Sequence, residues 1–171
     1  MTTYYKTLRT GRRGTHTEYV WPEPGTWIES VEGDLVACGN GYHVVTAEQL
    51  LGWISDEVWE VEAEDVQDGG DKAVCRRARL VRQVMGPREV RLFAADCAER
   101  VLPIFEAERP EDDRPRKAIV MARRYADGEA TAEELAAAWV TAGAAAGAAA
   151  GAAERDWQVE RLHAYLDKAE P

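Results

Sequence analysis

The pattern of hydrophobic and polar positions changes near residue 87 and divides the chain into two parts. Before that point, apolar and polar residues alternate in short stretches bounded by Gly and Pro, as is typical of half-buried strands. Thr46, with Gln49 three residues later, forms a capping box that predicts a short helix among them. The predicted strands are residues 2–9, 16–21, 26–30, 35–38, 58–64 and 72–84.

After residue 87, apolar residues recur at three- and four-residue spacing, which predicts amphipathic helices. Pro103 interrupts the first of them and is expected to kink or end it, because proline lacks the N–H that an interior helical position donates. The predicted fold class is therefore α+β. We expect a small β-rich α+β domain over residues 1–86 and an antiparallel helical domain over 88–171.

The last helix of this pattern contains a long alanine tract. Thr131 and Glu134 form a capping box at its start, and residues 131–153 are mostly Ala and Gly. Three glycines four residues apart lie along one side of a helix, where the missing side chains let another backbone approach closely. We expect one long Ala/Gly-rich helix whose seam packs internally or in a homodimer. The seam consists of Gly143, Gly147 and Gly151.

The charge is acidic and evenly distributed. The chain of 171 residues has a net charge of −10, and each half contributes −5. Such a surface repels a phosphate backbone and favours a protein partner over nucleic acid. Three well-separated cysteines without a C-x-x-C pair are typical of free intracellular thiols, so we expect a cytoplasmic protein. No apolar run predicts a membrane span, and no His/Cys spacing predicts a metal or other cofactor.

Three motifs in the second half occur together in order: ADCAERVLPIFE at 95–106, DDRPRKAI at 112–119 and WQVERLHAYL at 157–166. Together they resemble a helical family of putative bacterial immunity proteins. The resemblance implies a protein that binds and neutralises a protein partner. The candidate binding residues within these motifs are Asp96, Arg100, Asp112, Asp113, Arg114, Arg116, Trp157 and Arg161.

The first half has a different resemblance. Its aromatic first strand, the segment GNGYHVVTAEQLLGWI and the strand VWEVEAED are similar to a small uncharacterised domain of phage and bacterial proteins. Their order also resembles ADP-ribosyltransferase folds. That second resemblance would place a nicotinamide-nucleotide site at Tyr5, Arg9, His43, Glu60 and Glu62. We favour the alternative that His43 only closes a turn against the core.

Two charged clusters are interpreted structurally. At least one of the arginines between residues 76 and 82 is expected to form a cross-strand salt bridge with a carboxylate of the neighbouring acidic strand, such as Glu60, Glu62 or Glu64. Asp113 is expected to cap a helix that has Pro115 in its first turn. Arg114 and Arg116 are then expected to pair with Asp96 or Glu99 of the preceding helix.

The favoured function is thus a non-enzymatic protein-binding module of the immunity or defence type. One alternative is an ADP-ribosyltransferase-like enzyme or nucleotide-binding domain in the first half, with a regulatory helical half. A second alternative is an acidic mimic of nucleic acid, against which the interspersed arginines of the second half argue.

Overall fold

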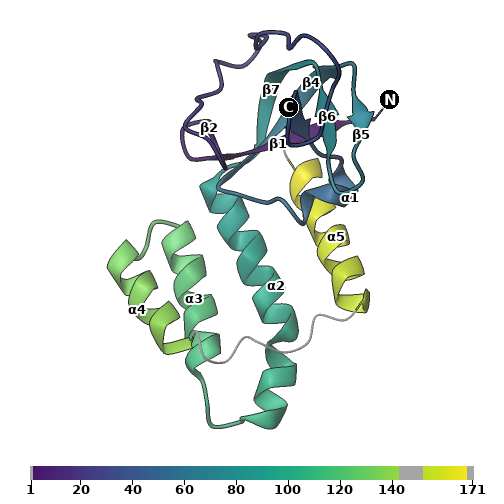
Figure 1. Cartoon of the computed structure of the whole chain (residues 1–171). Helices are drawn as coiled ribbons and strands as arrows, with labels where there is room; N and C mark the ends of the chain where they lie inside the picture. The colour runs from purple at the N-terminus through teal and green to yellow at the C-terminus, as the bar shows by residue number, and fades with distance from the viewer. Residues whose placement is uncertain (1, 143–151, 169–171) are drawn as a thin grey trace. The chain divides into compact units, whose positions relative to one another are not determined.

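The computed structural model describes residues 2–142 and 152–168 and confirms the α+β class (Figure 1). The chain forms two compact units. The first comprises the residues up to Gly86 together with the end of the last helix from Leu162, and the second comprises Pro87–Arg161.

A four-stranded antiparallel sheet forms the centre of the first unit. Its spatial order is β2-β1-β4-β7. Tyr5 of β1 lies opposite Glu60 of β4, and Lys6 lies opposite Trp59. The strands are β1 (Tyr4–Arg9), β2 (Arg13–Gly14), β4 (Glu57–Glu64) and β7 (Arg77–Met85).

A smaller antiparallel sheet has the order β3-β6-β5, with β3 (Tyr42–Val44), β5 (Gln67–Asp68) and β6 (Ala73–Cys75). The single strand predicted over 72–84 is therefore wrong, because the chain leaves one sheet and enters the other at Arg76. There the Arg76 N–H donates to the carbonyl of Glu64. This break explains the imperfect alternation in that stretch, since β6 is buried on both faces and β7 alternates.

The strands predicted at 16–21, 26–30 and 35–38 are also wrong. In that part of the chain the structure has only isolated bridges, at Val20 and at Val36. Its residues instead bond individually to the outer edge of β7, from Gly25 to Leu80 and from Ile28 to Ala78. Prolines and glycines prevent a regular ladder here, but the segment still covers a sheet edge that would otherwise be exposed to pairing.

The buried carboxylate of Glu57 supports the turn between β1 and β2. It accepts hydrogen bonds from the backbone N–H of Gly11 at 2.8 Å and of Arg12 at 3.3 Å, and from the indole of Trp59 at 2.9 Å. Arg12 has φ 59°, a conformation that few non-glycine residues adopt. Glu57 therefore stabilises the strained turn between β1 and β2 by accepting hydrogen bonds from its backbone.

The core of this unit is apolar and drawn from both sheets and the irregular segment. Leu8, Cys75 and Ala78 are completely buried, and Trp21 and Ile28 from the irregular segment are nearly so. Helix α1 (Ala47–Leu50) is the short helix predicted after Thr46, and its capping box is confirmed: the Gln49 side chain accepts from the N–H of Thr46 at 3.0 Å.

The predicted cross-strand salt bridges are confirmed. Arginines of β7 pair with the glutamates opposite them on β4 at 2.6–2.8 Å, namely Arg77 with Glu64, Arg79 with Glu62 and Arg82 with Glu60. These side chains are partly exposed, so each pair contributes little to stability, about 0–1 kcal/mol.

The second unit is helical, with α2 (Pro87–Glu108), α3 (Arg114–Ala126), α4 (Ala132–Ala142) and the first part of α5 (Ala152–Asp167). Helix α3 packs against both α2 and α4 (Figure 1). The core of this helical unit includes Leu102, Ile119 and Leu135. Pro103 does not end the first helix, since α2 continues past it to Glu108. The other expectation, a kink at Pro103, remains a prediction.

The capping box before α4 is confirmed by reciprocal bonds between Thr131 and Glu134, of 2.7 and 3.2 Å. The glycine seam of Gly143, Gly147 and Gly151 lies outside the described residues, as does the question of one continuous Ala/Gly-rich helix.

Candidate functional site

The helical unit contains a buried ionic cluster centred on Asp96 of α2. This side chain is only 7 % exposed and pairs with Arg123 of α3 at 2.8 Å and with Arg161 of α5 at 2.6 Å. Arg123 also pairs with Glu99 at 2.6 Å. Because a buried carboxylate is costly without partners, Asp96 and Arg161 have a structural role that connects three helices within the unit.

One turn further along α2, a second set of contacts joins α2 to α5. The guanidinium of Arg100 lies 5.6 Å from the ring centroid of Trp157, a cation–π contact, and 3.7 Å from the carboxylate of Glu154. Asp96 and Arg100 are four residues apart on α2, and Trp157 and Arg161 are four apart on α5. The structure therefore brings these four predicted residues together as two facing pairs.

The other predicted binding residues surround the turn between α2 and α3. Arg114 binds Asp112 through two side-chain contacts of 2.7 and 2.6 Å, and this hydrogen bonding lowers the pKa of Asp112 to about 2. Asp113 stands at the N-cap position but makes no capping bond, and pairs with Lys117 at 2.8 Å instead.

The expected partners of Arg114 and Arg116 are wrong. Arg116 does reach α2, but its bidentate partner is Glu106, at 2.8 and 2.7 Å. Glu106 is nearer the turn than Asp96 or Glu99, and those two carboxylates are bound by Arg123. The turn therefore carries its own compact set of ion pairs, with the guanidinium groups of Arg114 and Arg116 at least half exposed.

The five residues of the alternative nucleotide site are not brought together. Only Tyr5 and His43 line a common pocket. Arg9 binds Glu18 and the carbonyls of Gly14 and Thr17. The two glutamates of that alternative are held by arginines of β7 in the salt bridges described above, and neither lines the pocket.

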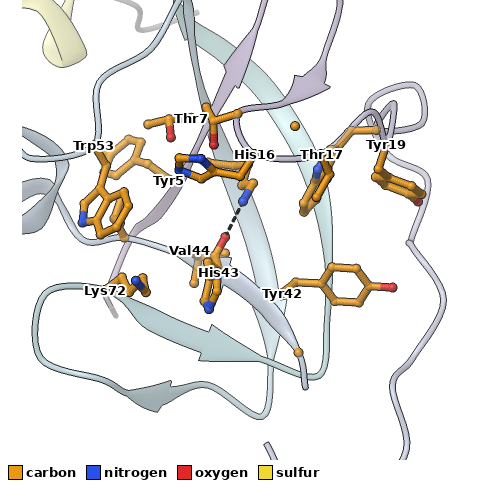
Figure 2. Close-up of a pocket in the computed structure, with 16 residues that line it drawn as sticks. Tyr5, Thr7, His16, Thr17, Tyr19, Tyr42, His43, Val44, Trp53 and Lys72 are labelled. Carbon is orange, nitrogen blue, oxygen red and sulfur yellow. Dashed lines mark hydrogen bonds between the residues drawn. The ribbon is translucent and has the colours of Figure 1, made fainter. Parts of the chain in front are cut away.

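That pocket has a volume of about 310 Å³ and lies where β1 changes its neighbour (Figure 2). On one edge of β1, Tyr5 is bridged to Val45, whereas Leu8 and Arg9 pair with β2. Lys6 and Thr7 lie between these two contacts. The opening is surrounded by aromatic side chains from several segments: Tyr5, Tyr19, Trp21, Tyr42 and Trp53.

Lys6 is the central charged group of the pocket, although it is not among the site residues predicted from the sequence. Its Nζ donates to the carbonyl of His43 at 2.9 Å, the bond drawn as a dashed line in Figure 2, and lies 5.4 Å from the ring centroid of Trp21. Burial lowers the pKa of Lys6 to about 8. The available signal was the alternation of β1, which places Lys6 on the same face as Tyr4 and Leu8.

His43 is held as a neutral acceptor. Its Nε2 accepts the backbone N–H of Cys38 at 2.9 Å, which leaves the ring proton on Nδ1. Burial, together with the nearby charges of Lys6 and Lys72, lowers the pKa of His43. The imidazole thus fixes the Cys38 backbone, in keeping with the favoured interpretation that it closes a turn.

The fold is α+β, and the helical unit contains a buried cluster of ion pairs around Asp96. Residues 83–155 match the family model of an Imm-5 like putative immunity protein. The match covers the first two motifs of the second half and ends before WQVERLHAYL. It supports an immunity-type role in general. No curated protein and no solved structure matches the chain.

Two further properties concern the described ranges alone. None of their helices is long and apolar enough to cross a membrane. Within 2–142 and 152–168, no cluster of three or more His, Cys, Asp or Glu side chains could hold a metal ion.

Proposed function

We propose that this protein is an immunity-type module that binds one protein partner and neutralises it, and that the helical unit makes the contact. The observation that carries this proposal is the match of residues 83–155 to the immunity family. The matched range includes the whole turn between α2 and α3 and its ion pairs.

The turn has the features of a protein-binding surface. It presents charged groups of both signs held in fixed geometry by Asp112–Arg114, Asp113–Lys117 and Glu106–Arg116. Exposed aliphatic residues occur nearby on both helices, Ile104 on α2 and Val120 on α3, each about half exposed. Arginines beside apolar groups are common at binding hot spots.

The net charge of the chain indicates the sign of the charge expected on the surface of the partner. A net charge of −10 accelerates association with a basic protein and opposes association with an acidic one. Asp112 remains ionised over the physiological range because its pKa is about 2. We therefore expect the partner to present a basic surface to the turn, and binding to weaken as salt is added.

A capture experiment followed by a growth assay tests this function. The tagged protein is used to purify partners from a bacterial lysate, and each captured protein is then expressed alone and with this chain. We expect one stoichiometric partner that arrests growth when alone and is harmless when co-expressed. Capture of no partner, or of a partner that is harmless alone, overturns the proposal.

A pair of charge-reversal variants tests the surface. D113K alters the turn, where 61 % of the Asp113 side chain is exposed, and D156K makes the same charge change at an exposed aspartate elsewhere in the helical unit. Because the expected partner surface is basic, we expect D113K to weaken binding at least tenfold and D156K to bind nearly as well as the unchanged protein. Equal loss in both variants would show that the partner reads overall charge and not this surface. Thermal melting of both variants checks that they fold.

A further inference from the structure

We propose that the pocket around Lys6 binds a small anion that carries an aromatic ring, of the nucleoside monophosphate class, and that the Lys6 ammonium is its counter-ion. This site lies in the β-rich unit, goes beyond the immunity-type role and does not depend on it.

The position of Lys6 within the sheet is unusual for a lysine. On β1, Lys6 lies between Tyr4, which packs against the core, and Leu8, which is completely buried. On the neighbouring strand it faces the buried Trp59. Lysine is rarely placed on such a face, because a buried ammonium loses its hydration and needs a compensating partner.

The described residues supply only part of the compensation that the Lys6 ammonium needs. The Lys6 Nζ has a carbonyl acceptor on His43 and the ring of Trp21, but it forms no ion pair with any described carboxylate. A bound anion would supply the missing charge. The ammonium lies beside the pocket where such a ligand would enter.

The pocket is positively charged within an otherwise acidic chain. Its lining includes the cations Lys6 and Lys72, and none of its described lining residues is Asp or Glu, although the Asp71 carboxylate lies 3.9 Å from the Lys72 ammonium. Acidic residues outnumber basic ones by 31 to 21 in the chain. The pocket is thus a locally positive place on a negative protein, which favours capture of an anion.

Other side chains of the pocket suit the planar ring and the sugar of such a ligand. Aromatic side chains at both ends of the pocket, Trp53 at one and Tyr19 and Tyr42 at the other, provide surfaces for a planar ring (Figure 2). Three threonines in the lining offer hydroxyl groups to a sugar: Thr7, Thr15 and Thr17. The volume of about 310 Å³ is at the small end of ligand pockets, and it suits a single nucleotide.

The charge distribution also argues against a nucleic acid as the occupant. A polynucleotide would have to extend its phosphates beyond the pocket along a surface whose net charge is −10. A mononucleotide places one phosphate beside Lys6 and none elsewhere. The single-nucleotide class is therefore the one that the electrostatics favour.

The test uses thermal shift and titration calorimetry on the full chain with AMP, GMP, CMP and UMP, their uncharged nucleosides, and inorganic phosphate. We expect at least one monophosphate to raise the melting temperature, because a ligand of the folded state stabilises it. Its nucleoside and free phosphate should bind at least tenfold more weakly. The proposal is overturned if no monophosphate binds, or if a nucleoside or phosphate alone binds equally well.

The variants K6M and K117M separate the site from general charge. Lys117 is an exposed lysine of the helical unit, with 72 % of its side chain accessible. We expect K6M to lose at least about tenfold in affinity, the loss typical of a charge-assisted contact, and K117M to bind normally. Equal binding by K6M overturns the role of Lys6.

A labelling experiment on the unchanged protein covers the case in which K6M fails to fold. Reductive methylation at pH 8, read by peptide mass spectrometry, should modify Lys6 in the free protein, and the bound monophosphate should protect Lys6 while leaving Lys117 reactive. Equal modification of Lys6 with and without a saturating ligand overturns the proposal.

Discussion

Arg161 of α5 reaches the buried carboxylate of Asp96 on α2 through two contacts to the same oxygen, 2.7 Å from Nε and 2.6 Å from Nη2. The two residues are 65 positions apart in the chain. Together with Arg123 on the other carboxylate oxygen, they make Asp96 the ionic centre of the helical unit.

Removal of the Asp96 charge should destabilise the protein. D96N leaves two arginines without their shared partner, and we expect the free energy of unfolding to fall by about 2–4 kcal/mol, below the full cost of breaking a buried pair because both arginines are partly exposed. R161M should cost less, because Arg123 still pairs with Asp96. Urea denaturation measures both values.

The control for that comparison is E108Q, at the exposed end of α2. It should change the free energy of unfolding by less than about 0.5 kcal/mol, as most surface substitutions do. If D96N were as stable as E108Q, the cluster would have no role in stability.

Glu57 should be a second sensitive carboxylate. In E57Q the amide group can replace only one of the two oxygens that accept hydrogen bonds from Gly11, Arg12 and Trp59. A buried N–H without an acceptor costs about 1–3 kcal/mol. We expect a loss of that size in chemical denaturation, whereas E62Q on the same strand should cost at most about 1 kcal/mol because its salt bridge is exposed. Equal losses would contradict this assignment.

The stability of K6M relative to the unchanged protein should depend on pH. The pKa of Lys6 falls from 10.5 to about 8 on folding, so the unfolded chain binds more protons between those values and the stability contribution of Lys6 rises with pH across that window. The stability of K6M relative to the unchanged protein should therefore fall as the pH rises from 8 to 10.5. Melting temperatures across this range, compared with K117M, measure the effect, and a constant difference would contradict it.

The same titration sets the pH dependence of ligand binding. The groups that face Lys6 are His43, whose pKa is lowered, and Cys75, whose pKa is raised to about 12, so both are neutral at pH 8. Lys6 then supplies the titrating charge. Affinity for a monophosphate should be highest near pH 7, where the phosphate is largely a dianion and Lys6 is protonated, and should fall as the pH passes 8. Calorimetry at pH 7 and 9.5 tests this. Equal affinity at both values would contradict it.

The three thiols should differ in reactivity. Cys38 is exposed, whereas burial is the main cause that raises the pKa of Cys97 to about 11 and that of Cys75 to about 12. A thiol above its usual pKa forms little thiolate at pH 8. An aromatic disulfide reagent should therefore label Cys38 rapidly and the other two only after denaturant is added. Rapid labelling of all three in the folded protein would contradict the burial of Cys75 and Cys97.

Local signals predicted much of this protein correctly. The capping boxes at Thr46 and Thr131 mark real helix starts, and the alternating charges on β4 and β7 form the expected ladder, because these depend on residues close in sequence or directly opposite across a hairpin. The resemblance of the second half is supported by the family match over residues 83–155. The resemblances proposed for the first half remain predictions.

The failures have a common physical origin in long-range packing. The residues between 16 and 38 have strand-like alternation, but they lie as an irregular segment along β7, with Trp21 and Ile28 in the core. Strand propensity could not show this, because the edge of β7 that this segment covers is formed by residues about fifty positions later in the chain. Similarly, Arg116 binds Glu106 because the turn brings those two side chains nearest each other.

By itself, the sequence determined the fold class, the helix starts, the cross-strand charge ladder and the acidic character of the chain, since each follows from local backbone preference, periodicity or composition. Only the tertiary structure decided that Asp96 is buried between Arg123 and Arg161, and that Lys6 lies beside a pocket lined by aromatic and basic residues. Both depend on which distant side chains exclude water from a charge. Burial, and not residue type, makes Asp96 a structural centre and Lys6 a candidate binding group.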